Sequence, residues 1–131
     1  MMKQLPDTCP PLTLIFGAFN PTGSEGLPAD AVTCAALGSH ALGALTGTYI
    51  ADSSGSQQIN PIIAEQIDEQ ARTLLEDVQI AAFKVGALFS PEAASVIAQI
   101  IADYSESPMV LHLGQSYLGS ESADGPDEYD V

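Results

Sequence analysis

Apolar residues gather in four short runs along the chain, separated by longer segments. Residues 12–16 (LTLIF) are typical of a strand that is buried on both faces, and residues 80–85 and 109–113 have the same character. Residues 40–50 form a weaker extended run, because glycines and small side chains interrupt it. The pattern therefore predicts four strands.

The segments between these runs carry helix signals. Residues 29–37 are rich in alanine and end at a glycine, a common helix terminator. Asn60-Pro61 and Ser90-Pro91 each match a helix N-cap followed by proline at the first helical position. We expect two apolar stripes to face the core, Ile63, Ile67, Ala71, Leu74 and Leu75 in one helix and Val96, Ile97, Ile100, Ile101 and Tyr104 in the other.

Strands and helices thus alternate as β-α-β-α-β-α-β, which predicts an α/β, Rossmann-like fold: a parallel sheet with helices on its faces. With 131 residues, of which 46% are apolar, the chain can bury one core. We expect residues 1–11 to form a leader and residues 12–119 the domain. Residues 120–131 are acidic and lack periodicity, which predicts a disordered tail.

The charge balance is strongly acidic, with three basic and seventeen acidic residues and a formal net charge of −14. Such a surface repels nucleic acid and anionic membranes, although high solubility or adaptation to salt explains it equally well. No apolar run could span a bilayer, and residues 1–11 lack the apolar centre of a signal peptide, so we expect a cytoplasmic protein. Cys9 and Cys34 are expected to be free thiols.

Four blocks, in order, carry a resemblance to a known family. They are residues 12–38 (LTLIFGAFNPTGSEGLPADAVTCAALG), 44–57 (ALTGTYIADSSGSQ), 81–92 (AAFKVGALFSPE) and 108–114 (PMVLHLG). The first has a Gly-rich turn between strand and helix, where a backbone can approach a small ligand. Together they resemble the hydroxymethylpyrimidine and phosphomethylpyrimidine kinases of thiamine synthesis.

The resemblance implies a ribokinase-like, three-layer fold, truncated here to about four strands. It also implies an ATP- and magnesium-dependent phosphoryl transfer to a pyrimidine. The match covers the N-terminal half of a family member. The other half, which supplies the nucleotide pocket, the anion hole and the aspartate that activates the substrate, has no counterpart in this sequence.

The resemblance places a substrate site on Asp30, Gly23, Thr48, Gly86 and Ala87. Asp30 matches the aspartate that helps to hold the hydroxymethyl group. Thr48 stands where the family has the glutamine that reads the edge of the pyrimidine ring, and Ala87 stands where a methionine closes the pocket. The alternative for Asp30 is a carboxylate that is favoured by the helix dipole alone.

Two further residues are candidate phosphate or charge partners. Lys84 matches a lysine of the family, and a structural ion pair or a snorkelling side chain is the alternative. His112 replaces an aspartate near the metal and the phosphates. It could transfer protons near neutral pH, or it could be a satisfied histidine at a strand end. Glu25 brings a carboxylate into the Gly-rich loop, where it would repel a phosphorylated substrate.

No catalytic residue and no metal site are identified, since histidine does not reproduce the affinity of a carboxylate for magnesium. Two functions stay open: a pyrimidine kinase that is impaired or inactive as an isolated chain, and a non-catalytic half-domain. The half-domain would bind a small pyrimidine-like ligand, or would form a homo-oligomer or pair with a complementing chain at an exposed sheet edge. Phosphoryl transfer depends on positioning and charge stabilisation, which makes the missing groups costly.

Overall fold

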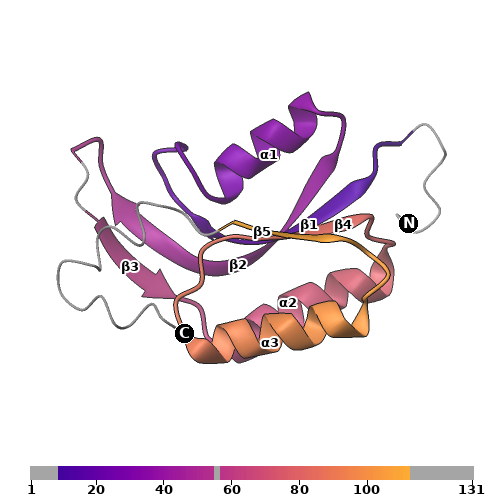
Figure 1. The fold of residues 1–131 in the computed structure, drawn as a ribbon. Coiled ribbons are helices and arrows are strands. Elements are labelled where there is room, and N and C mark those ends of the chain that lie inside the picture. Colours follow the sequence, from indigo (N-terminus) through magenta and orange to yellow (C-terminus); the bar gives the residue numbers. More distant parts are fainter. Residues whose placement is uncertain (1–8, 55–56, 113–131) are drawn as a thin grey trace.

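The computed structural model describes residues 9–54 and 57–112. Their strands form one sheet in the order β3-β2-β1-β4-β5 (Figure 1). Every neighbouring pair is parallel except β2 and β3, which are antiparallel. The elements are β1 (Leu12–Phe19), α1 (Leu27–Ala36), β2 (His40–Ala51), β3 (Gln57–Pro61), α2 (Ala64–Asp77), β4 (Ala82–Val85), α3 (Pro91–Asp103) and β5 (Met109–Leu111).

The helices cover both faces of the sheet. Helix α1 lies above it in Figure 1, and α2 and α3 lie side by side below it. This arrangement confirms the predicted three-layer α/β fold. The predicted tail, residues 120–131, and most of the predicted leader lie outside the described residues. Within the described part of the chain, no helix is both long and apolar enough to cross a membrane.

The main core lies between the sheet and the α2/α3 layer. On the central strand, Leu14 and Phe16 are fully buried, and the Phe16 ring stacks on Phe83 of β4 with the ring centroids 6.4 Å apart. The predicted stripes of α2 and α3 supply the other side of this core. Their most buried members are Ile67, Ala71 and Leu75 in α2, and Ile97 and Ile100 in α3.

The segment around Asn60-Pro61 corrects the prediction of a helix start. Both residues belong to β3, where Asn60 pairs with Thr48 of β2, and α2 begins only at Ala64. Strand β3 lies at the edge of the sheet, where a proline that lacks an N–H is tolerated. Ile63 precedes the helix and is 63% exposed, so it is not part of the buried stripe. Over residues 9–54 and 57–112, the sheet is therefore mixed and has five strands, not the four parallel strands that were predicted.

The start of α3 confirms the prediction. Ser90 is the N-cap, and its Oγ accepts a hydrogen bond from the Ala93 backbone N–H at 3.0 Å. Helix α1 also lies where expected and is followed by Gly38, whose φ of +87° favours glycine. Cys9 and Cys34 are both free thiols.

Candidate functional site

A cleft of about 230 Å³ lies where the central parallel strands end. In open α/β sheets, ligands bind in the crevice at the carboxyl ends of the strands. Side chains and backbone from β1, β2, β4, the loop before α1 and the segment after β4 meet there. The lining residues are Gly17, Ala18, Ser24, Glu25, Gly26, Ala29, Asp30, Tyr49, Lys84, Gly86, Ala87 and His112.

The loop between β1 and α1 forms one wall of the cleft, and its own polar groups give it a fixed shape. Asn20 is 2% exposed, and its Oδ1 accepts hydrogen bonds from the Thr22 backbone N–H and the Thr22 Oγ1. The Gly23 N–H donates to the Asn20 carbonyl at 3.0 Å, which closes the turn. An asparagine side chain that bonds two residues ahead is a common way to build such a turn.

Gly26 ends this loop as the N-cap of α1. Its φ of 81° and ψ of −159° fall in a region that is essentially restricted to glycine. A Cβ at this position would lie 2.4 Å from the Ala18 carbonyl oxygen, because the loop returns to pair with the end of β1. Glycine is therefore required here both for its conformation and for the close approach.

Asp30 and Lys84 form an ion pair inside the cleft. Lys84 Nζ donates to Asp30 Oδ1 at 2.6 Å, and the two side chains are 27% and 17% exposed. Asp30 lies in the first turn of α1, where the helix dipole also favours a carboxylate. Lys84 comes from the middle of β4, next to Ile15 of the central strand. The pair joins α1 to the sheet and leaves Asp30 at the cleft surface.

The structure brings most of the predicted site residues together, but not all of them. Gly23 and Thr48 are not among the residues that line the cleft. His112 lies at the end of β5, where its backbone N–H donates to the Val85 carbonyl at 2.9 Å. The predicted residues that do line the cleft are Asp30, Lys84, Gly86, Ala87 and His112.

Tyr49 lines the cleft and was not predicted from the sequence. It follows Thr48 on β2, is 6% exposed, and makes an edge-on contact with the ring of Phe89. One signal was present in the sequence: a large aromatic residue within the block at residues 44–57 that carries part of the family resemblance. Because neighbouring strand residues face opposite sides, the two positions do not share an environment.

The charges of the cleft do not fit a nucleotide with magnesium. Glu25 and Asp30 place two carboxylates among the residues that line the cleft, and Lys84, which also lines it, is already paired with Asp30. Magnesium prefers oxygen ligands, whereas one of the side chains that line the cleft is the imidazole of His112. In the part of the chain that the structure describes, no group of three or more His, Cys, Asp or Glu side chains is placed to hold a metal ion.

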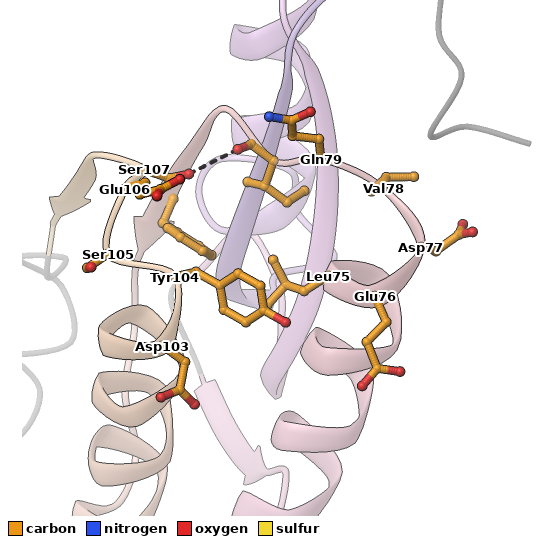
Figure 2. Close-up of a pocket in the computed structure, with 12 residues that line it drawn as sticks. Leu75, Glu76, Asp77, Val78, Gln79, Asp103, Tyr104, Ser105, Glu106 and Ser107 are labelled. Atoms are coloured by element: carbon orange, nitrogen blue, oxygen red, sulfur yellow. Dashed lines mark hydrogen bonds between the residues drawn. The ribbon is translucent and has the colours of Figure 1, made fainter.

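A second, larger cavity of about 540 Å³ lies at the other end of the sheet, beside the segments that lead into β4 and β5 (Figure 2). Leu75 and Tyr104 both line it, and Tyr104 packs against the hydrophobic core to which Leu75 belongs. Ser107 Oγ donates to the Ile80 carbonyl at 3.0 Å. The carboxylates at its rim belong to Glu76, Asp77, Asp103 and Glu106.

Arg72 donates hydrogen bonds from its guanidinium to Asp103 at 2.9 Å and to Asp68 at 2.8 Å. These bonds lower the pKa of the Asp103 carboxyl and raise the pKa of Arg72. The Asp103 side chain is 42% exposed to solvent, so the ion pair contributes little to the stability of this end of the molecule.

Comparisons with known proteins agree with this architecture. Residues 20–112 match the family model described as phosphomethylpyrimidine kinase. A hydroxymethylpyrimidine/phosphomethylpyrimidine kinase of Streptomyces coelicolor is 30% identical over 119 residues, which are 91% of this chain and 44% of the relative.

Solved structures show the same fold. The crystal structure of phosphomethylpyrimidine kinase from Clostridium difficile matches with a TM-score of 0.74 and 20% identity, over 85% of this chain and 53% of that one. An ADP complex of Bacillus subtilis pyridoxal kinase matches with a TM-score of 0.73 and 23% identity, over 78% and 39%. The chain thus spans about half the length, or less, of these relatives. Through the match to residues 20–112, it belongs to the phosphomethylpyrimidine kinase family.

Proposed function

We propose that this chain, acting in the cytoplasm, binds a small aromatic ring with a hydroxymethyl group, as a substrate-binding half of a pyrimidine kinase. The observation that carries the proposal is Asp30 at the cleft, held by Lys84 at 2.6 Å. A carboxylate fixed in this way can accept a hydrogen bond from a substrate hydroxyl. Gly86 and Ala87 leave room beside it for a ring.

We propose further that the isolated chain does not transfer a phosphoryl group. ATP carries several negative charges, which need cations, backbone N–H groups or a metal ion. In the described residues, Lys84 is the cation of the cleft, and Arg72 pairs with Asp68 and Asp103 instead. The transition state would therefore lack most of its charge stabilisation.

Calorimetric titration with hydroxymethylpyrimidine and with ATP, beside a coupled assay of ADP release, tests both parts. We expect the ring to bind with a Kd of about 1 mM and no ADP release above the blank. Asp30→Asn should weaken ring binding about tenfold, because the amide is a poorer acceptor. Absence of ring binding would contradict the first part. ADP release that disappears in Asp30→Ala would contradict the second.

A second candidate function is a non-catalytic module that associates with another chain, and the exposure of β5 favours it. Met109, Val110 and Leu111 are 45%, 60% and 57% exposed, and in the described residues β5 pairs with β4 alone. An open, apolar edge strand invites pairing with a strand of a second chain. That chain is either another copy or a complementing half of the kinase fold.

Light scattering at low and at physiological salt tests the self-association form of this candidate. Two copies with a net charge of −14 repel each other, so a dimer should strengthen as salt screens the repulsion. Val110→Lys should abolish the dimer, since a charged side chain on an edge strand opposes pairing. A monomer at both salt concentrations would contradict self-association.

A further inference from the structure

Tyr49 occupies the position in the cleft that the resemblance assigns to its neighbour. The family reads the ring edge with a residue that corresponds to Thr48, yet Thr48 does not line the cleft and Tyr49 does. Tyr49 is 6% exposed and pairs with Ile59 of β3, so its backbone is fixed in the antiparallel ladder. The cleft therefore has an aromatic wall on the β2 side.

Phe89 holds this wall in place. Its ring meets the Tyr49 ring edge-on, with the centroids 5.9 Å apart and the planes at 84°. Phe89 also packs against Gly47, where a Cβ would lie 2.6 Å from Phe89 Cε2. Because Gly47 has no side chain, the Phe89 ring can pack directly against β2.

Hydrogen bonds fix the segment after β4 that carries Phe89. Thr46 Oγ1 donates to the Ala87 carbonyl at 2.9 Å, and the Gly86 N–H donates to the Phe16 carbonyl at 2.7 Å. Gly86 and Ala87 themselves line the cleft. The aromatic pair and the Gly86-Ala87 lining are thus joined by a ring contact and by hydrogen bonds, and a lining held in this way can fix the orientation of a ligand ring.

We infer that Tyr49 is the ring-binding residue of this cleft and that Phe89 is its positioning residue. Together they select a flat aromatic ring over a saturated one. This inference rests on the proposed function. A tyrosine ring packs against another aromatic ring in offset or edge-on geometry, whereas a saturated ring with several hydroxyl groups gains less from it. The shared ligand chemistry is a hydroxymethyl-bearing pyrimidine or pyridine, whose hydroxyl meets Asp30 while its ring packs on Tyr49.

The test compares the Kd of three probes, hydroxymethylpyrimidine, pyridoxal and ribose, for the whole chain and its variants. The wild type should bind one or both aromatic rings at least about tenfold more tightly than ribose. Tyr49→Leu should weaken aromatic binding about five- to tenfold and leave ribose unchanged, whereas Tyr49→Phe should retain most of the affinity. Phe89→Leu should give a smaller loss, since it releases Tyr49 without removing the ring.

Tyr104→Leu, a matched change in the other cavity, is the control and should leave all three Kd values unchanged. Circular dichroism of each variant checks that it is folded; if Tyr49→Leu unfolds, Phe89→Leu and Tyr49→Phe decide the question. If Tyr49→Leu binds an aromatic ring as tightly as the wild type does, this inference is overturned and the proposed function is not. If only Phe89→Leu folds, unchanged aromatic binding by that variant has the same consequence. A wild type that binds none of the probes overturns the proposed function and this inference with it. Preference for pyridoxal over hydroxymethylpyrimidine, or the reverse, supports the inference and identifies the ring.

Discussion

The cleft and the larger cavity differ both in volume and in the groups that surround them. The cleft of about 230 Å³ holds the mostly buried ion pair of Asp30 and Lys84, and the backbone of several glycines forms part of its wall. The cavity of about 540 Å³ is larger, but the charged groups that line it are exposed carboxylates at or just beyond the ends of α2 and α3. Size alone would select the end of the sheet opposite to the one where most of the predicted site residues meet.

The difference follows from the direction of the parallel strands. At their carboxyl ends, helix α1 begins, and its N-terminal dipole favours the Asp30 carboxylate. At the opposite end, α2 and α3 terminate, and neither has a basic residue in its last turn. Carboxylates such as Glu76 and Asp77 are electrostatically unfavourable at these C-termini. The carboxyl ends of the strands therefore carry a favourable ion pair, whereas the opposite end carries carboxylates that the helix dipoles disfavour. We refer to the latter as the charge conflict.

The largest effect that we expect is at Gly26. Gly26→Ala should lower the free energy of unfolding by about 3 kcal/mol and abolish ring binding, because the added Cβ meets the Ala18 carbonyl oxygen and the backbone is strained. Gly23→Ala is the matched control. Gly23 also has a positive φ but has open space around it, so the loss should be about 1 kcal/mol. Urea denaturation measures both, and equal losses would contradict the role of the close approach.

The second effect compares the two ion-pair sites. Lys84→Met should cost about 2 kcal/mol, because it leaves the mostly buried Asp30 carboxylate without its partner. Arg72→Met should cost less than about 1 kcal/mol, since Arg72, Asp68 and Asp103 are all partly exposed. A double-mutant cycle of Asp30→Asn and Lys84→Met isolates the coupling. A coupling energy near zero would show that the pair at the cleft is no stronger than an ordinary surface pair.

A smaller effect tests the charge conflict at the other end. Glu76→Lys, in the last turn of α2, should raise the free energy of unfolding by about 0.5 kcal/mol, because it replaces an unfavourable charge by a favourable one. Glu65→Lys, in the first turn of the same helix, changes the net charge equally and should be neutral or destabilising. Thermal melts of the two variants are compared. Equal stabilisation would mean that net charge, and not the helix dipole, is responsible.

The smallest effect concerns pH. The pKa of Asp103 is lowered in the folded chain by the hydrogen bond from Arg72, so its contribution to stability is present above its ordinary value of 3.8 and is lost as pH falls through the lower, folded value. Asp103→Asn should therefore lower the Tm slightly at pH 7 and have a vanishing effect at pH values below that range. A Tm difference that is constant across this range would contradict the ion pair as its cause.

Local signals predicted the parts of the fold that depend on local structure. Ser90-Pro91 was interpreted as a helix start, and Ser90 is indeed the N-cap of α3. Asn60-Pro61 carries the same signal, yet it belongs to β3. The two dipeptides differ in a long-range contact, the ladder between Asn60 and Thr48 of β2, which no local pattern reveals.

The candidate site shows the same limit. Asp30 and Lys84 were each identified from the sequence, but they are 54 residues apart, and their pairing depends on how α1 packs on the sheet. Thr48 and Tyr49 are neighbours, and the alternation of a strand decides which of them reaches the cleft. Gly26 was recognised only as part of a Gly-rich loop, because its clash distance arises from the return of that loop to the end of β1.

The central claim is that ligand binding belongs to the cleft and not to the larger cavity. A titration of the ¹⁵N-labelled chain with hydroxymethylpyrimidine, followed by amide chemical shifts, tests it directly. The account predicts that the amide signals of Ser24, Asp30 and Gly86 move with increasing ligand, whereas those of Val78 and Ser105 stay in place. Shifts confined to Val78, Ser105 and their neighbours in the larger cavity, or no shifts at all, would contradict it.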